Sequence, residues 1–345
     1  MKMLPLASLA LVVASASCIA AATPKPVDRL TSVTELYSLT DSSISPWHLK
    51  FNVTVFDDKG QNPNAGTVEV WHAGKDSRIV TTLGASTLTR IEIGGKVYRS
   101  STGPDVPYSV EDAVQDILHP GPTLDDLQHS KLELRKQNFG KLLLDCVMVT
   151  RPDDGVADTP LGFYPAYCLQ PGDDRLIEIF NVGGQRVDII RVGKFLNHEV
   201  PMKFNVHQGA VVVLTADIVS LGTYTPSPGE FNPTPGMHVE GATRVPGVSA
   251  EVKLLTKVDP NPPERVIKNQ ISGEVTLHIV IGGDGRVRSM HVVSSPASDL
   301  TMAADLRMAA MEAVRQWTFK PYRVNGDPVE VDTTISISFT TSTHP

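Results

Sequence analysis

The stretch that decides the fold of the last quarter of the chain is Leu306–Pro321, with the sequence LRMAAMEAVRQWTFKP. Its apolar side chains recur at intervals of four, three and four residues, which predicts one stripe along a helix, made of Leu306, Ala310, Ala313 and Trp317. Proline has no N–H for the helical ladder, so the helix is expected to end before Pro321. A hairpin pattern precedes the helix at 271–293 and a strand pattern follows it at 330–339. A helix with one apolar stripe must bury that stripe, and a sheet of these strands is the nearest surface for it. The pattern therefore predicts a small α+β domain.

This order of elements resembles the C-terminal domain of the TonB family, the periplasmic energy transducers of Gram-negative envelopes. The resemblance rests on four blocks in sequence order, which are Gly273–Val275, Asp284–Gly285, Ala313–Pro321 and Asn325–Val329. It implies that partners pair at a sheet edge. We therefore expect the last strand to offer a partner-binding edge, with alternating residues Val331, Thr333, Ile335, Ile337 and Phe339. The alternative is an internal strand or a shielded edge.

The N-terminus has the pattern of a secretory signal peptide. Lys2 precedes the apolar run Leu4–Ala16, and small residues lead up to Ala22, so residues 1–22 are expected to be removed on export to the periplasm. A lipoprotein acylated at Cys18 is the alternative. No later apolar run has the length of a spanning helix. Classical transducers instead keep an N-terminal membrane helix and a proline-rich rod.

Length and composition favour two globular domains and argue against nucleic acid as a partner. The chain has 345 residues, 41% hydrophobic, with a net charge of −7. Such an acidic balance argues against nucleic-acid binding. Residues 223–250 are rich in proline and glycine and are predicted to link a first domain at 23–222 to a second at 251–345.

The first domain is predicted to be an antiparallel sheet with few helices. Strict alternation from Trp47 to Val55 predicts a strand with one buried face, and further strands follow at short intervals. A leading helix within 23–41 and another near 110–118 complete the pattern. This architecture resembles the LolA/LolB-like lipoprotein-carrier half-barrel, which implies an apolar hollow for a lipid-like ligand. Its candidate lining is Trp47, Leu49, Phe51, Val53 and Val55.

Two cysteines, Cys146 and Cys168, follow the signal region. An oxidising compartment favours a disulfide between them, across turn-forming residues that include Asp153–Gly155 and Pro160. Such a bridge is expected to stabilise the fold by roughly 3 kcal/mol on the chain-entropy model. A redox or metal role is the alternative, although no C-x-x-C pair is present.

No pattern in the sequence predicts catalysis, a cofactor or a metal. There is no G-x-S-x-G nucleophile motif. The glycine-rich run Gly282–Gly285 lies between two predicted strands and opens no helix, so it predicts a hairpin turn rather than a phosphate cradle. His278 and His291 are expected to face each other across that hairpin, without a third ligand.

We therefore predict a non-enzymatic periplasmic protein that binds an envelope protein, an apolar ligand or both. One alternative is an energy-transducing TonB-type protein for outer-membrane transport. The other is a secreted hydrolase.

Overall fold

We describe a computed structural model of the protein. It describes residues 25–57, 59–103, 106–150, 160–182, 185–240, 244–246, 252–295, 300–324 and 327–340. The predicted signal peptide, 1–22, lies outside the described residues. None of the helices in these ranges is long and apolar enough to cross a membrane.

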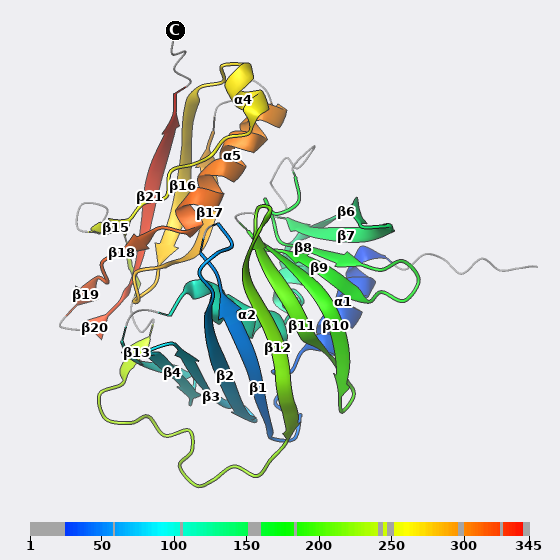
Figure 1. Ribbon diagram of the computed structural model, residues 1–345, viewed down its shortest axis with the longest axis vertical. Helices are drawn as coiled ribbons and strands as arrows, with labels where there is room; N and C mark the ends of the chain where they lie inside the picture. The colour runs from blue at the N-terminus through cyan, green and yellow to red at the C-terminus, as the bar shows by residue number, and fades with distance from the viewer. Residues whose placement is uncertain are drawn as a thin grey trace, which may run out of the picture.

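An open antiparallel sheet forms the first part of the protein (Figure 1). Within the described ranges it has 13 strands, in the order β13-β5-β4-β3-β2-β1-β12-β11-β10-β9-β8-β7-β6. The edge strands β6 and β13 do not pair with each other, so the sheet curves without closing into a barrel. The strands are β1 (Trp47–Val55), β2 (Asn64–Ala73), β3 (Asp76–Leu83), β4 (Ser86–Ile93), β5 (Lys96–Thr102), β6 (Lys131–Phe139), β7 (Leu142–Thr150), β8 (Ala166–Leu169), β9 (Leu176–Phe180), β10 (Gln185–Phe195), β11 (His198–Gln208), β12 (Val211–Thr223) and β13 (His238–Glu240).

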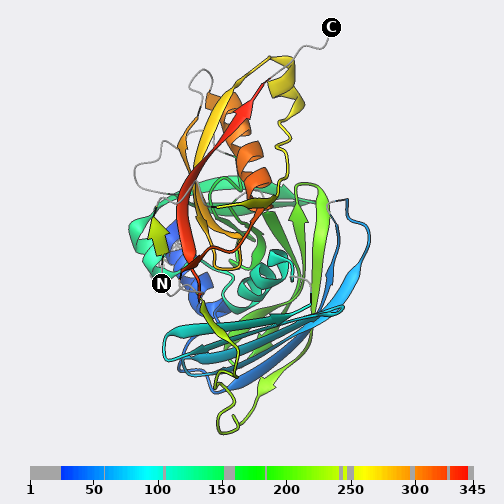
Figure 2. The same ribbon diagram turned by 90° about the vertical axis from the view of Figure 1, so that its left-hand side faces the viewer.

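Helices cover the concave face of this sheet, as Figure 2 shows. They are α1 (Pro26–Tyr37), α2 (Tyr108–Leu118) and the short α3 (Leu124–His129). Both α1 and α2 contact β11, and α2 also contacts β12. One apolar stripe of each longer helix enters the core, with Leu30 and Tyr37 from α1 and Val110 and Ile117 from α2 all 0% exposed. The predicted half-barrel architecture is therefore confirmed.

The helices fill the hollow that the sequence led us to expect. Trp47, Leu49 and Phe51 are 0% exposed and Val53 is 1% exposed, while Val55 is half-buried beside the same core. Trp47 also donates a hydrogen bond from its indole Nε1 to the Leu39 carbonyl oxygen, 3.1 Å away. In this conformation these residues are packed core, and the expectation that they line an open hollow is wrong. The reason is that the apolar stripes of α1 and α2 pack against this surface, so the helices cover the place where a ligand would bind.

The segment between the domains is more structured than a simple linker. Its stretch between β12 and β13 loops past the lower ends of the strands in the view of Figure 1. It then pairs through β13 with β5, and β14 (Arg244–Pro246) pairs in parallel with β21 (Glu330–Phe339). The prediction of a linker over 223–250 is therefore corrected, because this segment contributes one strand to each of the two main sheets.

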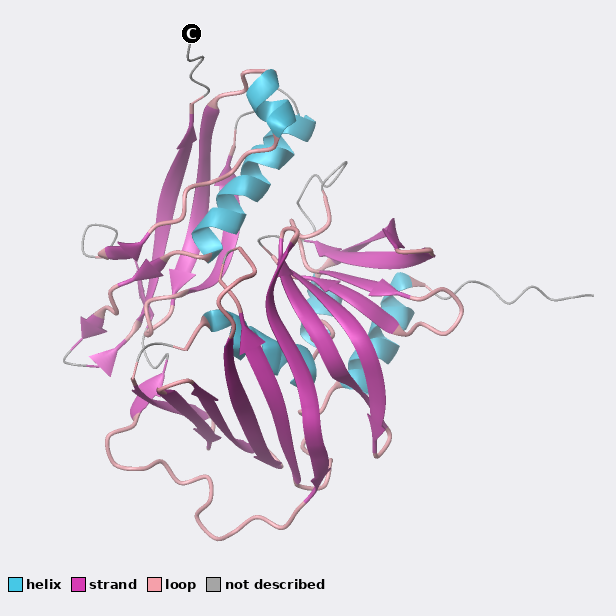
Figure 3. Cartoon of the chain, in the orientation of Figure 1, coloured by secondary structure: helices cyan, strands magenta, loops and turns pink. Residues whose placement is uncertain are grey.

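The C-terminal domain places one long helix on a small sheet (Figure 3). Its described strands have the order β14-β21-β16-β17. The helix α5 covers the face of β16 and β17. The remaining elements are β15 (Leu254–Thr256), α4 (Glu264–Lys268), β16 (Gly273–Ile281), β17 (Val287–Ser294), α5 (Leu300–Arg315), β18 (Thr318–Phe319), β19 (Arg323–Val324) and β20 (Asp327–Pro328).

The apolar stripe of α5 is the core of this domain. Leu306 and Ala310 are 0% exposed, and Trp317 follows the helix at 7% exposure. The Trp317 indole Nε1 donates to the Val258 carbonyl oxygen at 2.8 Å. The helix begins at Leu300, six residues before the quoted stretch, because Ala303 continues the buried stripe towards the N-terminus. The predicted hairpin is also confirmed, since β16 and β17 pair antiparallel on either side of the glycine-rich turn.

Candidate functional site

The predicted edge strand β21 directs its alternating residues into the domain core. Val331 is 1% exposed, Ile337 is 6% exposed and Phe339 is 7% exposed, while Thr333 is also buried and Ile335 is half-buried. These five side chains face the interior side of the sheet. A partner strand beside β21 would therefore meet its main chain rather than these side chains.

The outer edge of β21 is occupied over only part of its length. Strand β14 pairs with Glu330, Val331 and Asp332. From Thr333 to Phe339, no strand of the described residues lies on that side, whereas β16 pairs along the whole opposite side. The expected edge is thus shielded at its start by the chain's own β14 and open beyond it.

The solvent face of the same sheet carries a polar network. The Ser336 hydroxyl donates to Glu274 Oε1 at 3.0 Å and lies 3.2 Å from Thr276 Oγ1. His278 and His291 are direct cross-strand neighbours, with stacked rings whose centroids are 4.6 Å apart. This confirms that they face each other. The described residues contain no group of three or more His, Cys, Asp or Glu side chains placed to hold a metal ion.

Arginines join the C-terminal domain to the half-barrel. Arg315, at the end of α5, forms an ion pair with Asp112 of α2 through Nη2 and Oδ2, 2.8 Å apart. Its Nη1 donates to the Val182 carbonyl oxygen at 3.0 Å. Arg286 donates to the Val106 carbonyl oxygen at 3.2 Å. The Asp112 ion pair attaches the second domain to α2, which lies in the concave face of the sheet, and the other two bonds attach it to the segments after β9 and before α2.

Two of the clefts between the domains lie beside β17. The aromatic cleft, of about 440 Å³, lies between the half-barrel residues Phe163, Tyr164 and Tyr167 and the C-terminal residues Arg307 and Met311. The Arg307 guanidinium stands over the Phe163 ring, 5.0 Å from its centroid. The Asp116 cleft, of about 340 Å³, lies between the end of α2 and the first half of β17. Together the two clefts follow β17 along its whole length.

The Asp116 cleft contains a buried carboxyl group with an unusual pKa. Asp116 is 8% exposed, and within the described residues its Oδ2 has no hydrogen-bond partner. Burial away from water, reinforced by the nearby Asp112 carboxylate, raises the pKa of Asp116 to about 8, against smaller lowering effects of Asn181 and Arg315. Asp116 therefore holds its proton at neutral pH.

Sequence reasoning missed this cleft. It predicted a helix near 110–118 but could not choose among many acidic residues. The available signal was the spacing of Asp112 and Asp116, which puts both carboxyl groups on one face of that helix. The partner residues Tyr167, Asn181 and Arg315 come from three other parts of the chain, and no local pattern connects them.

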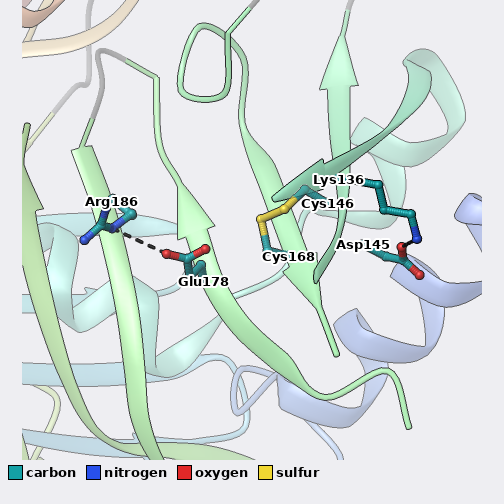
Figure 4. The surroundings of a disulfide bond; sticks show 6 residues. All are labelled: Lys136, Asp145, Cys146, Cys168, Glu178 and Arg186. Carbon is teal, nitrogen blue, oxygen red and sulfur yellow. Dashed lines mark hydrogen bonds and ion pairs between the residues drawn. A yellow bond between two sulfur atoms is a disulfide. The ribbon is translucent and has the colours of Figure 1, made fainter. Parts of the chain in front are cut away.

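The predicted disulfide is confirmed. Cys146 of β7 and Cys168 of β8 are direct neighbours across an antiparallel pair, and both are 0% exposed (Figure 4). Next to the bridge, Asp145 binds Lys136 and also Arg29 of α1, whose Nη1 lies 3.0 Å from Asp145 Oδ2. The bridge joins β7 to β8, and the Arg29–Asp145 ion pair holds β7 against α1.

Removing the disulfide is expected to destabilise the half-barrel. The double variant Cys146→Ser with Cys168→Ser should lower the free energy of unfolding by about 3 kcal/mol, because the unfolded chain regains the freedom that the bridge removes. Denaturant titration measures the loss, and reduced wild-type protein is the matched control. An unchanged midpoint after reduction would contradict the prediction.

Comparisons with known proteins agree with the resemblance of the last quarter of the chain to the TonB C-terminal domain. Residues 259–341 match the family model of the Gram-negative bacterial TonB protein C-terminal. Among curated proteins, the comparison finds no match.

Three solved structures are similar in part. A DUF1329 family protein from Desulfovibrio piger is 9% identical, with 60% of this chain and 95% of that chain covered and a TM-score of 0.39. A LolA superfamily protein from Nitrosomonas europaea is 12% identical over 60% of this chain and 96% of that one, with a TM-score of 0.41. The TonB C-terminal domain from Pseudomonas aeruginosa is 22% identical over 29% of this chain and 97% of that one, with a TM-score of 0.24.

Proposed function

We propose that this protein, whose last quarter matches the TonB C-terminal family, is a non-enzymatic binding protein of the periplasm that takes up a β-strand from an envelope partner. The observation that carries the proposal is the edge of β21, where β14 covers only Glu330–Asp332. An open strand edge presents unpaired N–H and C=O groups, which an extended segment of another chain satisfies by forming one more ladder.

The length of the open edge supports this function. It runs from Thr333 to Phe339. Seven residues of extended chain span roughly 23 Å, about the length of an ordinary strand. On the solvent face this edge carries Thr334, Ser336 and Ser338, which are exposed and uncharged. An incoming strand therefore meets no like-charge repulsion from these side chains.

Site-specific photo-cross-linking in the native host tests the proposal. A photoreactive residue placed at Ser336 or Ser338 is expected to capture one discrete envelope protein. The matched control is Val219 of β12, which is 58% exposed on the half-barrel and should capture none. The same product from all three positions, or none from the two serines, would contradict strand addition.

A second candidate function, binding of an apolar ligand, is supported by the walls of the aromatic cleft. Phe163, Tyr164 and Met311 line it, and its volume is about 440 Å³. Native mass spectrometry of protein from its own host tests this function. A co-purifying lipid that is lost in the variant Met311→Glu would support it, and an empty wild-type protein would contradict it.

A further inference from the structure

We infer that the Asp116 cleft binds a primary ammonium group carried on a short apolar stem. This site is separate from the β21 edge and needs both domains. Asp116 and Tyr167 come from the half-barrel, while Ser289, Met290 and Arg315 come from the C-terminal domain.

The local charges leave one carboxyl group without a cation. Asp112 is paired with Arg315 at 2.8 Å, and Arg288 is paired with Asp284 at 3.1 Å. Among the described residues that line the cleft, Asp116 is the acidic group without an ion-pair partner. Once it is ionised, Asp112, Asp116 and Arg315 together carry one net negative charge. A single monovalent cation would neutralise them.

The remaining groups around Asp116 suit an ammonium ion with an apolar stem. The Tyr167 ring lines the cleft, and an aromatic face attracts a cation. The Asn181 and Gln115 side chains supply amide oxygens that can accept hydrogen bonds from the ammonium. Pro165, Ile179 and Met290 form apolar walls for a hydrocarbon stem.

The other titratable groups of the cleft do not supply the cation that would neutralise Asp116. Burial lowers the pKa of His119, which therefore enters the cleft as a neutral imidazole. The pKa of Tyr167 is raised by its burial and by Asp126 and Asp116, so its phenol stays neutral as well. The guanidinium of Arg315 is held by Asp112 and the Val182 carbonyl oxygen.

Binding is coupled to the loss of one proton. At neutral pH the Asp116 carboxyl group is protonated, and the incoming ammonium, with a pKa near that of lysine at about 10.4, keeps its own proton. The Asp116 proton passes to buffer as the ion pair forms. The affinity should therefore rise about tenfold per pH unit from pH 6 to pH 7 and level off above about pH 8.

Calorimetric titration of the full chain with n-butylammonium chloride tests the inference. In two buffers of different ionisation enthalpy, we expect release of close to one proton per ligand at pH 6 and much less at pH 9. The neutral analogue n-butanol and potassium chloride should bind at least tenfold more weakly. The variant Asp116→Asn, which retains a neutral side chain of the same shape, should lose the pH dependence and most of the affinity.

A lysine derivative blocked at both main-chain ends identifies the source of the ammonium. Tighter binding than n-butylammonium would assign the site to a protein side chain, and weaker binding would assign it to a free amine. The inference is overturned if n-butanol binds as well as n-butylammonium, or if neither ammonium compound binds wild-type protein. It is also overturned if binding to wild type releases no proton at pH 6. These wild-type measurements decide the matter even if Asp116→Asn fails to fold, and they are independent of the cross-linking at β21.

Discussion

Replacing Gly285 by alanine is expected to unfold the C-terminal domain while the half-barrel stays folded. Gly285 has a φ of +82°, and a Cβ atom at this position would lie 1.9 Å from the Phe319 carbonyl oxygen. The Phe319 N–H also donates to the Gly285 carbonyl oxygen at 2.7 Å, so the two segments cannot separate without losing that bond. We expect a loss on the order of 3–5 kcal/mol, which is at the upper end for single substitutions.

The matched control for this substitution is Gly236→Ala. Gly236 has a similar φ of +90°, but no atom lies within 4 Å of its added Cβ. Only the backbone strain remains, and it should cost roughly 1–2 kcal/mol. Hydrogen exchange followed by mass spectrometry separates the two effects by domain. Faster exchange confined to 273–339 in Gly285→Ala is the expected result, and equal behaviour of the two variants would contradict the steric argument.

Replacing Asp116 by asparagine is expected to stabilise the protein increasingly as the pH rises. The folded protein holds the Asp116 proton with a pKa of about 8, while the unfolded chain releases it near 3.8. Between these values the unfolded state binds fewer protons, so wild-type stability falls with rising pH by up to about 1.4 kcal/mol per pH unit. Asparagine does not ionise, and the variant avoids this loss. Denaturant midpoints of the two proteins from pH 5 to pH 9 measure the difference.

The substitution Asp112→Asn should have the opposite effect. Asp112 is charged and paired with Arg315, and its side chain is only 14% exposed. Removing its charge abolishes the ion pair with Arg315 at the domain contact, which should cost about 1–3 kcal/mol. If both variants shift stability in the same direction at pH 9, the roles assigned to the two carboxyl groups are wrong.

Local patterns were sufficient to predict most of the secondary structure. Alternation from Trp47 to Val55 predicted β1 with its observed bounds, because a half-buried strand must place apolar residues at every second position. The apolar stripe ending at Trp317 predicted α5 for the same kind of reason. Each pattern identifies the face of the element that is buried, but it does not identify the element that packs against that face.

Elements without such patterns were missed. Strand β11 contains Pro201, which usually argues against a strand, but here it lies opposite Val192 beside a register shift in β10, where a missing N–H is tolerated. The short α3 was also missed, although its capping box from Thr123 to Asp126 was a usable signal. Strands β13 and β14 form only because each finds an edge of another sheet, which no local sequence window contains.

The amino-acid sequence by itself determined the curved sheet, the small α+β domain and the Cys146–Cys168 pairing, because periodicity and cysteine number are local properties. Tertiary structure alone decided that helices fill the hollow and that β14 shields the start of β21. It also decided that Asp116 lies at a cleft between domains, where its Oδ2 has no hydrogen-bond partner among the described residues. The physical reason is that burial and pairing depend on which distant surfaces meet, and two segments compete for one surface only after the chain has folded.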